Sequence, residues 1–187
     1  QGSELKNRVV FYDFSEIGKN VPNRLVGGFD DEFQGDMVPR VTYMGSPYSC
    51  AFSGKALTFF SSRNLASPEL VEQRNIEERI DSVFYSDEYA AAIVRNTNGE
   101  YGSRLEVYKK DGTHVLSKEF NFEYTHADFD GDLIILYNED SCRIYNMSGT
   151  EKFDATFDFP VSKIRKGRFP GTLVVTGPQQ MQELKLR

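Results

Sequence analysis

The chain has 187 residues, of which 39% are hydrophobic, 13% aromatic and 27% charged. This composition is typical of a water-soluble globular protein rather than a disordered or membrane-embedded one. A formal net charge of −6 argues against a surface for nucleic acid or anionic lipid, because binding phosphates requires a clustered basic face. The two cysteines form neither a disulfide framework nor a zinc motif, and we expect no metal site and no cofactor.

One short strand pattern recurs along the chain. It is an apolar run that closes on an aromatic or aliphatic residue before a polar turn, and the closing residues are Tyr12, Phe60, Tyr108, Tyr145 and Leu186. The steps between them are 48, 48, 37 and 41 residues, a spacing typical of repeats that hold four short strands each, as in a propeller blade. We therefore expect the aromatic closing residues to pack between neighbouring units.

Runs of β-branched and aromatic residues between turn signals predict the strands in chain order. Segments 9–14 and 24–29 supply the last two strands of a partial blade. Complete blades follow at 39–44, 49–53, 56–61 and 69–74, then at 81–85, 89–95, 104–109 and 114–120, then at 126–129, 133–137, 142–147 and 152–157. Residues 161–187 supply the first three strands of a last partial blade. The prediction is an all-β fold, a β-propeller segment of about four blades of four antiparallel strands, in a single domain over residues 1–187.

Glycines mark the expected hairpins. Asp111-Gly112 and Ser148-Gly149 stand at the same place between third and fourth strands, and Asn98-Gly99 marks a further turn. Glycine supplies the positive φ angles that such turns need. A helix over 68–80 is the alternative to a strand in that segment, because Glu and Arg are dense there, although its apolar residues form no clean helical stripe.

Carboxylates offer the main enzymatic possibility. The segment from Asp128 to Asp132 is similar to a calcium loop, but the EF-hand spacing requires Gly at the sixth position and Glu at the twelfth. We interpret it as a plain hairpin, with calcium binding as the alternative. Propeller-fold glycoside hydrolases use inward-facing acids, so Asp81, Asp128 and Asp130 are candidate channel-facing carboxylates.

Exposed aromatic loop residues are the candidate surface for a ligand or partner. These residues are Tyr48, Tyr89, Tyr101 and Phe169. A separate group of four cations is interpreted as a solvated strand end rather than a phosphate site, and it consists of Lys163, Arg165, Lys166 and Arg168.

Six segments carry a resemblance to a known family: 9–18 (VVFYDFSEIG), 24–29 (RLVGGF), 80–85 (IDSVFY), 117–122 (SKEFNF), 135–138 (ILYN) and 142–145 (CRIY). Together they resemble a bacterial domain-of-unknown-function family with a propeller-like repeat of the WD40 or PQQ kind. The resemblance implies that this chain is the carboxy-terminal part of a larger propeller. It also implies a protein held outside the cytoplasmic membrane by an anchor that is absent from this chain. It implies no catalytic residue.

The expected function is that of a non-catalytic extracytoplasmic module that binds a protein partner or a ligand. The alternatives are a carbohydrate-active enzyme that uses the three candidate carboxylates and a scaffold for envelope assembly. Open propeller ends would expose apolar faces and strand edges, which predicts either self-association or completion of the ends by further sequence.

Overall fold

The computed structural model describes residues 7–15, 18–20, 23–30, 33, 37–95 and 100–186. Seventeen strands are found in these residues: β1 (Val9–Tyr12), β2 (Leu25–Phe29), β3 (Arg40–Tyr43), β4 (Tyr48–Phe52), β5 (Ala56–Ser61), β6 (Glu69–Asn75), β7 (Ile80–Tyr85), β8 (Tyr89–Arg95), β9 (Ser103–Lys109), β10 (His114–Phe120), β11 (His126–Asp130), β12 (Leu133–Tyr137), β13 (Ser141–Asn146), β14 (Glu151–Thr156), β15 (Lys163–Lys166), β16 (Thr172–Thr176) and β17 (Met181–Lys185). Within the described part of the chain, no helix is long and apolar enough to cross a membrane.

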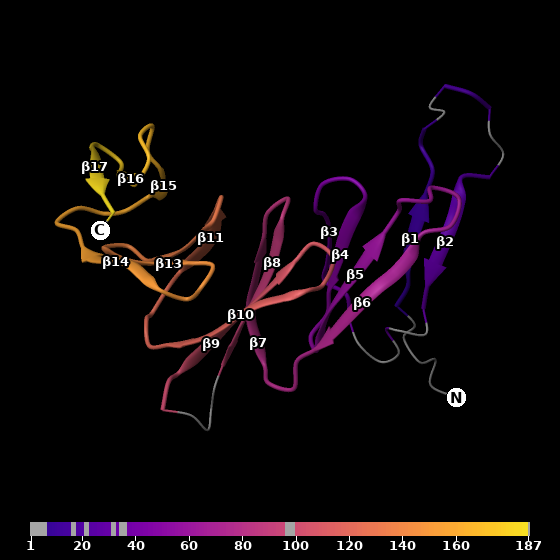
Figure 1. Cartoon of the computed structure of the whole chain (residues 1–187), viewed down its shortest axis with the longest axis horizontal. Helices are drawn as coiled ribbons and strands as arrows, with labels where there is room; N and C mark the ends of the chain where they lie inside the picture. Colours follow the sequence, from indigo (N-terminus) through magenta and orange to yellow (C-terminus); the bar gives the residue numbers. More distant parts are fainter. Residues whose placement is uncertain are drawn as a thin grey trace. The chain divides into compact units, whose positions relative to one another are not determined.

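The strands form five antiparallel sheets in which hydrogen-bonded neighbours are consecutive in sequence (Figure 1). Three sheets have four strands, β3–β6, β7–β10 and β11–β14, and the end sheets are β1–β2 and β15–β17. The chain divides into two compact units: Gln1–Arg95 with Tyr108–His114, and Asn96–Val107 with Val115–Arg187. The sheet β7–β10 contributes to both units.

The predicted all-β organisation is confirmed strand by strand. Observed boundaries differ from the predicted ones by at most two residues, and the end sheets hold the two and three strands expected of them. The helical alternative over 68–80 is wrong, because β6 and the start of β7 occupy that segment. The turn expected at Asn98-Gly99 lies outside the described residues. The prediction of a single domain over residues 1–187 stays a prediction.

The second strand of each complete sheet is buried on both faces, which explains its continuous apolar sequence. In the first unit, Cys50 and Phe52 of β4 pack in one cluster with Ala92 and other residues of β8. Between them along β4, Ala51 points to the opposite face and joins a cluster with Val9 of β1. Because successive strand residues alternate between faces, the sheet β3–β6 packs against β8 on one face and against β1 on the other.

The second unit repeats this arrangement. Ile135 of β12 and Ile144 of β13 are fully buried in a cluster with Ile164 of β15 and Leu173 of β16. Leu184 of β17 packs at the margin of the same cluster. The apolar residues of one sheet are thus covered by the next sheet along the chain.

A register irregularity precedes the closing residue of the repeat in three sheets. The ladder shifts between Phe11 and Tyr12, between Phe59 and Phe60, and between Ile144 and Tyr145. A bulge of this kind bends the strand and increases its twist. The recurring sequence pattern therefore encodes a bend in the third strand as well as a buried side chain.

Candidate interaction surface

Two of the four predicted aromatic residues begin strands, and the other two lie in connections. Tyr48 and Tyr89 begin the second strands of their sheets, β4 and β8, and both are partly buried. Phe169 lies in the connection between β15 and β16 and is 62% exposed. Tyr101 lies between β8 and β9 and is 38% exposed, so it stands at the opposite end of the β8 strand from Tyr89.

Tyr48 is placed among polar groups suited to recognition. The Arg63 guanidinium lies 3.5 Å from the phenol oxygen of Tyr48, and the Lys110 ammonium lies 6.0 Å from the centre of its ring. Lys110 also binds the Glu88 carboxylate at 2.7 Å. These four residues are called the Tyr48 patch below.

The Tyr48 patch is held by the fold beneath it. The Tyr48 ring packs against the buried core of the first unit, and its amide donates to Gly45 O at 2.8 Å. The Lys110 amide donates to Glu88 O at 2.9 Å. Hydrogen bonding to the Glu88 carboxylate raises the pKa of the Lys110 ammonium. The patch thus presents a fixed aromatic ring between two cations, one of them paired and one exposed.

Sequence reasoning found Tyr48 but missed Arg63 and Lys110. Both cations follow third strands, Arg63 after β5 and Lys110 after β9. The meander brings the connection after a third strand to the same sheet end as the connection before a second strand. Applying this rule to the predicted strands would have indicated that charged residues of those turns lie near Tyr48.

Asp81, a predicted channel carboxylate, is held by two arginines. Its Oδ2 accepts from Arg95 Nε at 2.9 Å, and its Oδ1 lies 3.5 Å from Arg79 Nε. Both carboxylate oxygens of Asp81 are thus engaged by guanidinium groups. This environment favours a structural role on β7 over that of a general acid.

Asp128 and Asp130 are bound by the neighbouring strand β15. Arg165 donates to Asp128 at 2.6 Å, and the Lys166 amide donates to Asp130 at 2.6 Å. The Lys166 ammonium binds Asp132. The predicted calcium segment and the predicted basic cluster therefore pair with each other. Within the described residues, no group of three or more His, Cys, Asp or Glu side chains is arranged to hold a metal ion.

We expect Asp128 and Arg165 to contribute little to stability. Their side chains are 37% and 40% exposed, and exposed ion pairs are typically worth about 0.2–1 kcal/mol. A double-mutant cycle of Asp128→Asn, Arg165→Ala and the double variant, measured by urea unfolding, should give a coupling free energy within that range. The coupling free energy should fall further when salt is added. A rise in stability with added calcium in the parent chain, lost in Asp128→Asn, would contradict the ion-pair interpretation.

Among the described residues, three carboxyl groups have a lowered pKa, those of Asp13, Asp111 and Asp132. Amide hydrogen bonds from Ser15 and Thr113 lower the pKa of Asp13 and of Asp111 respectively. The bond from the Lys166 ammonium lowers the pKa of Asp132. The proton donor of a glycoside hydrolase requires the opposite shift, so these three groups are unsuited to that role.

The other residues predicted to be buried differ in how exposed their side chains are. Tyr108 and Tyr145 are 6% and 2% exposed, as expected of residues between sheets, whereas Tyr12 is 55% exposed. Cys50 and Cys142 are free and buried, as predicted, and burial raises the pKa of both thiols, that of Cys142 to about 12.

Solved structures similar to this chain share its fold. BBS1N, solved in complex with ARL6DN, has a TM-score of 0.53 at 7% identity, with 87% of this chain and 56% of that chain covered. A HIRA fragment has a TM-score of 0.51 at 10% identity, with 76% and 49% covered. The Neurospora crassa Pan2 WD40 domain has a TM-score of 0.48 at 10% identity, with 88% and 53% covered. The chain spans about half the length of each of these proteins.

The successive four-stranded antiparallel sheets, with the similarities to BBS1N and to the HIRA fragment, define the class as β-propeller. A family model matches residues 1–186, and the chain belongs to that family, described as a family of unknown function (DUF5711). No curated protein matches the chain significantly.

Proposed function

We propose that this chain is a non-catalytic interaction module that binds a protein partner through the Tyr48 patch. The observation that carries the proposal is the fixed Tyr48 ring with Arg63 and Lys110 beside it. Tyrosine and arginine are enriched among residues that dominate binding energy at protein interfaces. Glu88 neutralises Lys110, which leaves Arg63 to pair with a carboxylate of the partner.

The resemblance described above supports a finer proposal about the whole protein. This chain is the carboxy-terminal part of a larger propeller that works outside the cytoplasmic membrane, held there by an anchor outside this chain. Protease added to intact spheroplasts should then cleave the protein, while a cytoplasmic marker stays intact. Protection of both proteins until the membrane is lysed would contradict the location.

Cross-linking tests the Tyr48 patch directly. A photoreactive phenylalanine analogue placed at position 48 of the full-length protein in its own cells should give one discrete protein adduct. The same analogue at position 101 is the matched control. Tyr101 is an exposed aromatic residue that follows the second strand of its sheet, whereas Tyr48 begins the second strand of its own. With the partner identified, Tyr48→Ala or Arg63→Ala should weaken binding by about tenfold or more, whereas Tyr101→Ala should not.

The cross-linking variants, together with a glycan assay, distinguish the alternative functions. Adducts of equal yield at positions 48 and 101 would contradict the Tyr48 patch as the binding site. Hydrolysis of any member of a glycan panel, abolished by Asp81→Asn, Asp128→Asn or Asp130→Asn, would favour the carbohydrate-active enzyme. Many different adducts at position 48 would favour an assembly scaffold with several partners.

A further inference from the structure

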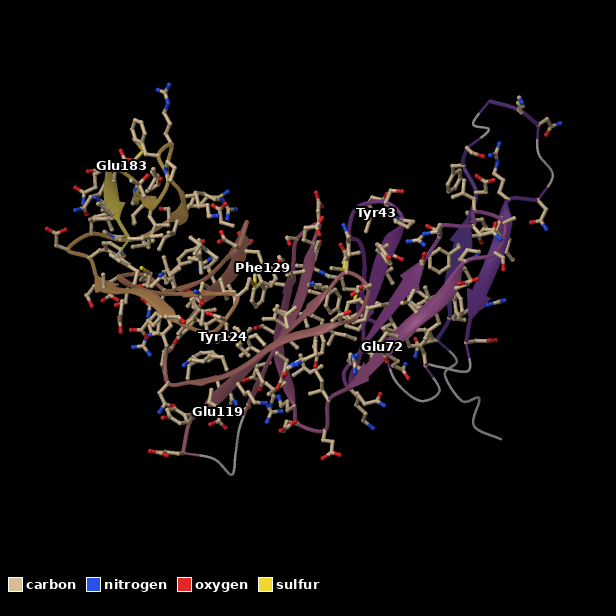
Figure 2. The ribbon with its side chains drawn as sticks, in the orientation of Figure 1. Tyr43, Glu72, Glu119, Tyr124, Phe129 and Glu183 are labelled. Carbon is tan, nitrogen blue, oxygen red and sulfur yellow. The ribbon has the colours of Figure 1, made fainter. Side chains whose placement is uncertain are left out.

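Two turns of the sheet β3–β6 hold one side of the Tyr48 patch. Tyr43, labelled in Figure 2, ends β3, and a short turn leads from it into Tyr48 at the start of β4. In the turn after β5, the Ser62 amide donates to Pro47 O at 2.8 Å. The exposed Arg63 therefore extends from a turn that is fixed to the turn before Tyr48.

Two turns of the next sheet, β7–β10, hold the other side of the patch. The turn after β9 is tied to the turn after β7, because the Lys110 amide donates to Glu88 O at 2.9 Å. The turn after β7 also packs on the turn before Tyr48, since a Cβ added to Gly45 would lie 3.5 Å from Asp87 O. The Tyr48 ring thus lies between a cation from its own sheet and an acidic turn from the next one.

The acidic turn presents its carboxylates to solvent, although a lysine is paired with it. The Glu88 side chain is 63% exposed, whereas that of Lys110 is 28% exposed. Asp87, the residue before Glu88, is exposed as well. A partner that approaches this side of the patch therefore meets the carboxylates before the Lys110 ammonium, and on the other side it meets the Arg63 guanidinium.

We infer that the partner segment bound by the Tyr48 patch is dipolar, with a carboxylate facing Arg63 and a lysine or arginine facing Glu88. An apolar or aromatic residue between these two charges packs on the Tyr48 ring. A uniformly acidic or uniformly basic segment would instead meet like charge at one side of the ring, which is unfavourable at an interface. The inference rests on the proposed function and names the chemistry of the partner that the patch selects.

Exchanging the two members of the Glu88–Lys110 pair tests the dipolar partner. The double variant Glu88→Lys, Lys110→Glu keeps the ion pair and the net charge but makes the more exposed member a cation. The photoreactive analogue stays at position 48 of the full-length protein in its own cells. The exchange should lower the yield of the discrete adduct by about tenfold or more, because a lysine then faces the cationic end of the segment.

Two single variants complete the test. Arg63→Glu should lower the adduct yield by a similar factor, because it turns a carboxylate towards the acidic end of the segment. Glu77→Lys is the matched control, since Glu77 is an exposed carboxylate of the first unit in the connection between β6 and β7. It should leave the yield unchanged. Urea midpoints equal to that of the parent chain show that each variant is folded.

The direction of the change in the exchanged pair decides the outcome. A higher adduct yield would overturn the inference, because a purely acidic segment gains from an exposed cation at that place. An unchanged yield, or an equal loss in Glu77→Lys, would overturn it as well, while the Tyr48 patch remains the binding site. No adduct at position 48 in the parent chain would contradict the proposed function, and the inference would fail with it.

Discussion

Replacing Phe60 with alanine is expected to lower the free energy of unfolding by about 3–5 kcal/mol, the usual cost of truncating a buried Phe. Phe60 is fully buried, and its ring lies 4.9 Å from that of Phe29, 5.4 Å from that of Phe11 and 6.4 Å from that of Phe33. Removing it leaves a cavity between β5 and the amino-terminal sheet, which those aromatic neighbours cannot fill from the backbone positions that hold them.

Phe14→Ala is the matched control for Phe60→Ala. Phe14 lies in the same unit but is 59% exposed, with contacts to Tyr12 and Arg24. Its truncation should cost less than about 1 kcal/mol. Urea unfolding followed by circular dichroism compares the two variants. Similar losses would mean that the amino-terminal sheet is not packed on β5 in solution.

Most of the fold could be predicted from two kinds of signal. Continuous apolar runs such as those of β8 and β12 identified inner strands, because a strand covered on both faces needs no alternation. The regular spacing of the closing residues then indicated four strands in each repeat. Even β6, where Glu and Arg suggested a helix, followed the repeat, since tertiary pairing with β5 outweighs local propensity.

Other features depend on neighbours that a sequence does not show. Tyr12 has the same place in the repeat as Phe60, yet Tyr12 is exposed and Phe60 is buried, because in the part of the chain that the structure describes only Phe60 has a sheet packed over it. Similarly, Asp128 and Arg165 are 37 residues apart and were given separate interpretations, but adjacent strands bring them to 2.6 Å. Patterns along the chain locate strands well and locate contacts between sheets poorly.

The candidate site was predicted only in part for the same reason. An aromatic residue at a strand end identified Tyr48 as readily as Tyr101, and nothing in their local sequences distinguishes them. The difference lies in Arg63 and Lys110, which reach Tyr48 from turns elsewhere in the first unit. A binding surface made of turns from several strands becomes visible only when the sheet ends are assembled.

Gly112→Ala is expected to destabilise the protein by about 2–4 kcal/mol, through two separate effects. Gly112 has a φ of 81°, a conformation that costs an alanine about 1 kcal/mol or more. Its added methyl group would also lie 2.5 Å from Glu72 Cβ and 3.1 Å from Phe59 Cδ2. Because a Cβ is fixed to its backbone, β6 or the 110–113 turn has to move, and overpacking of this kind typically costs about 1–3 kcal/mol.

Gly171→Ala separates the two effects on Gly112. Gly171 has a similar φ of 72°, but an added Cβ would meet nothing within 4 Å, so only the backbone cost of about 1 kcal/mol remains. The difference in urea midpoint between the two variants therefore measures how tightly the 110–113 turn packs on β6. That packing includes the bond from Arg74 Nε to Gly112 O at 2.9 Å, so Gly112→Ala should also speed exchange of the β6 amides, which Gly171→Ala leaves unchanged. Equal losses of unfolding free energy in the two glycine variants would show that the 110–113 turn does not pack on β6 in solution. The sheets β3–β6 and β7–β10 would then lack, at this turn, a contact that the stacking of propeller blades requires.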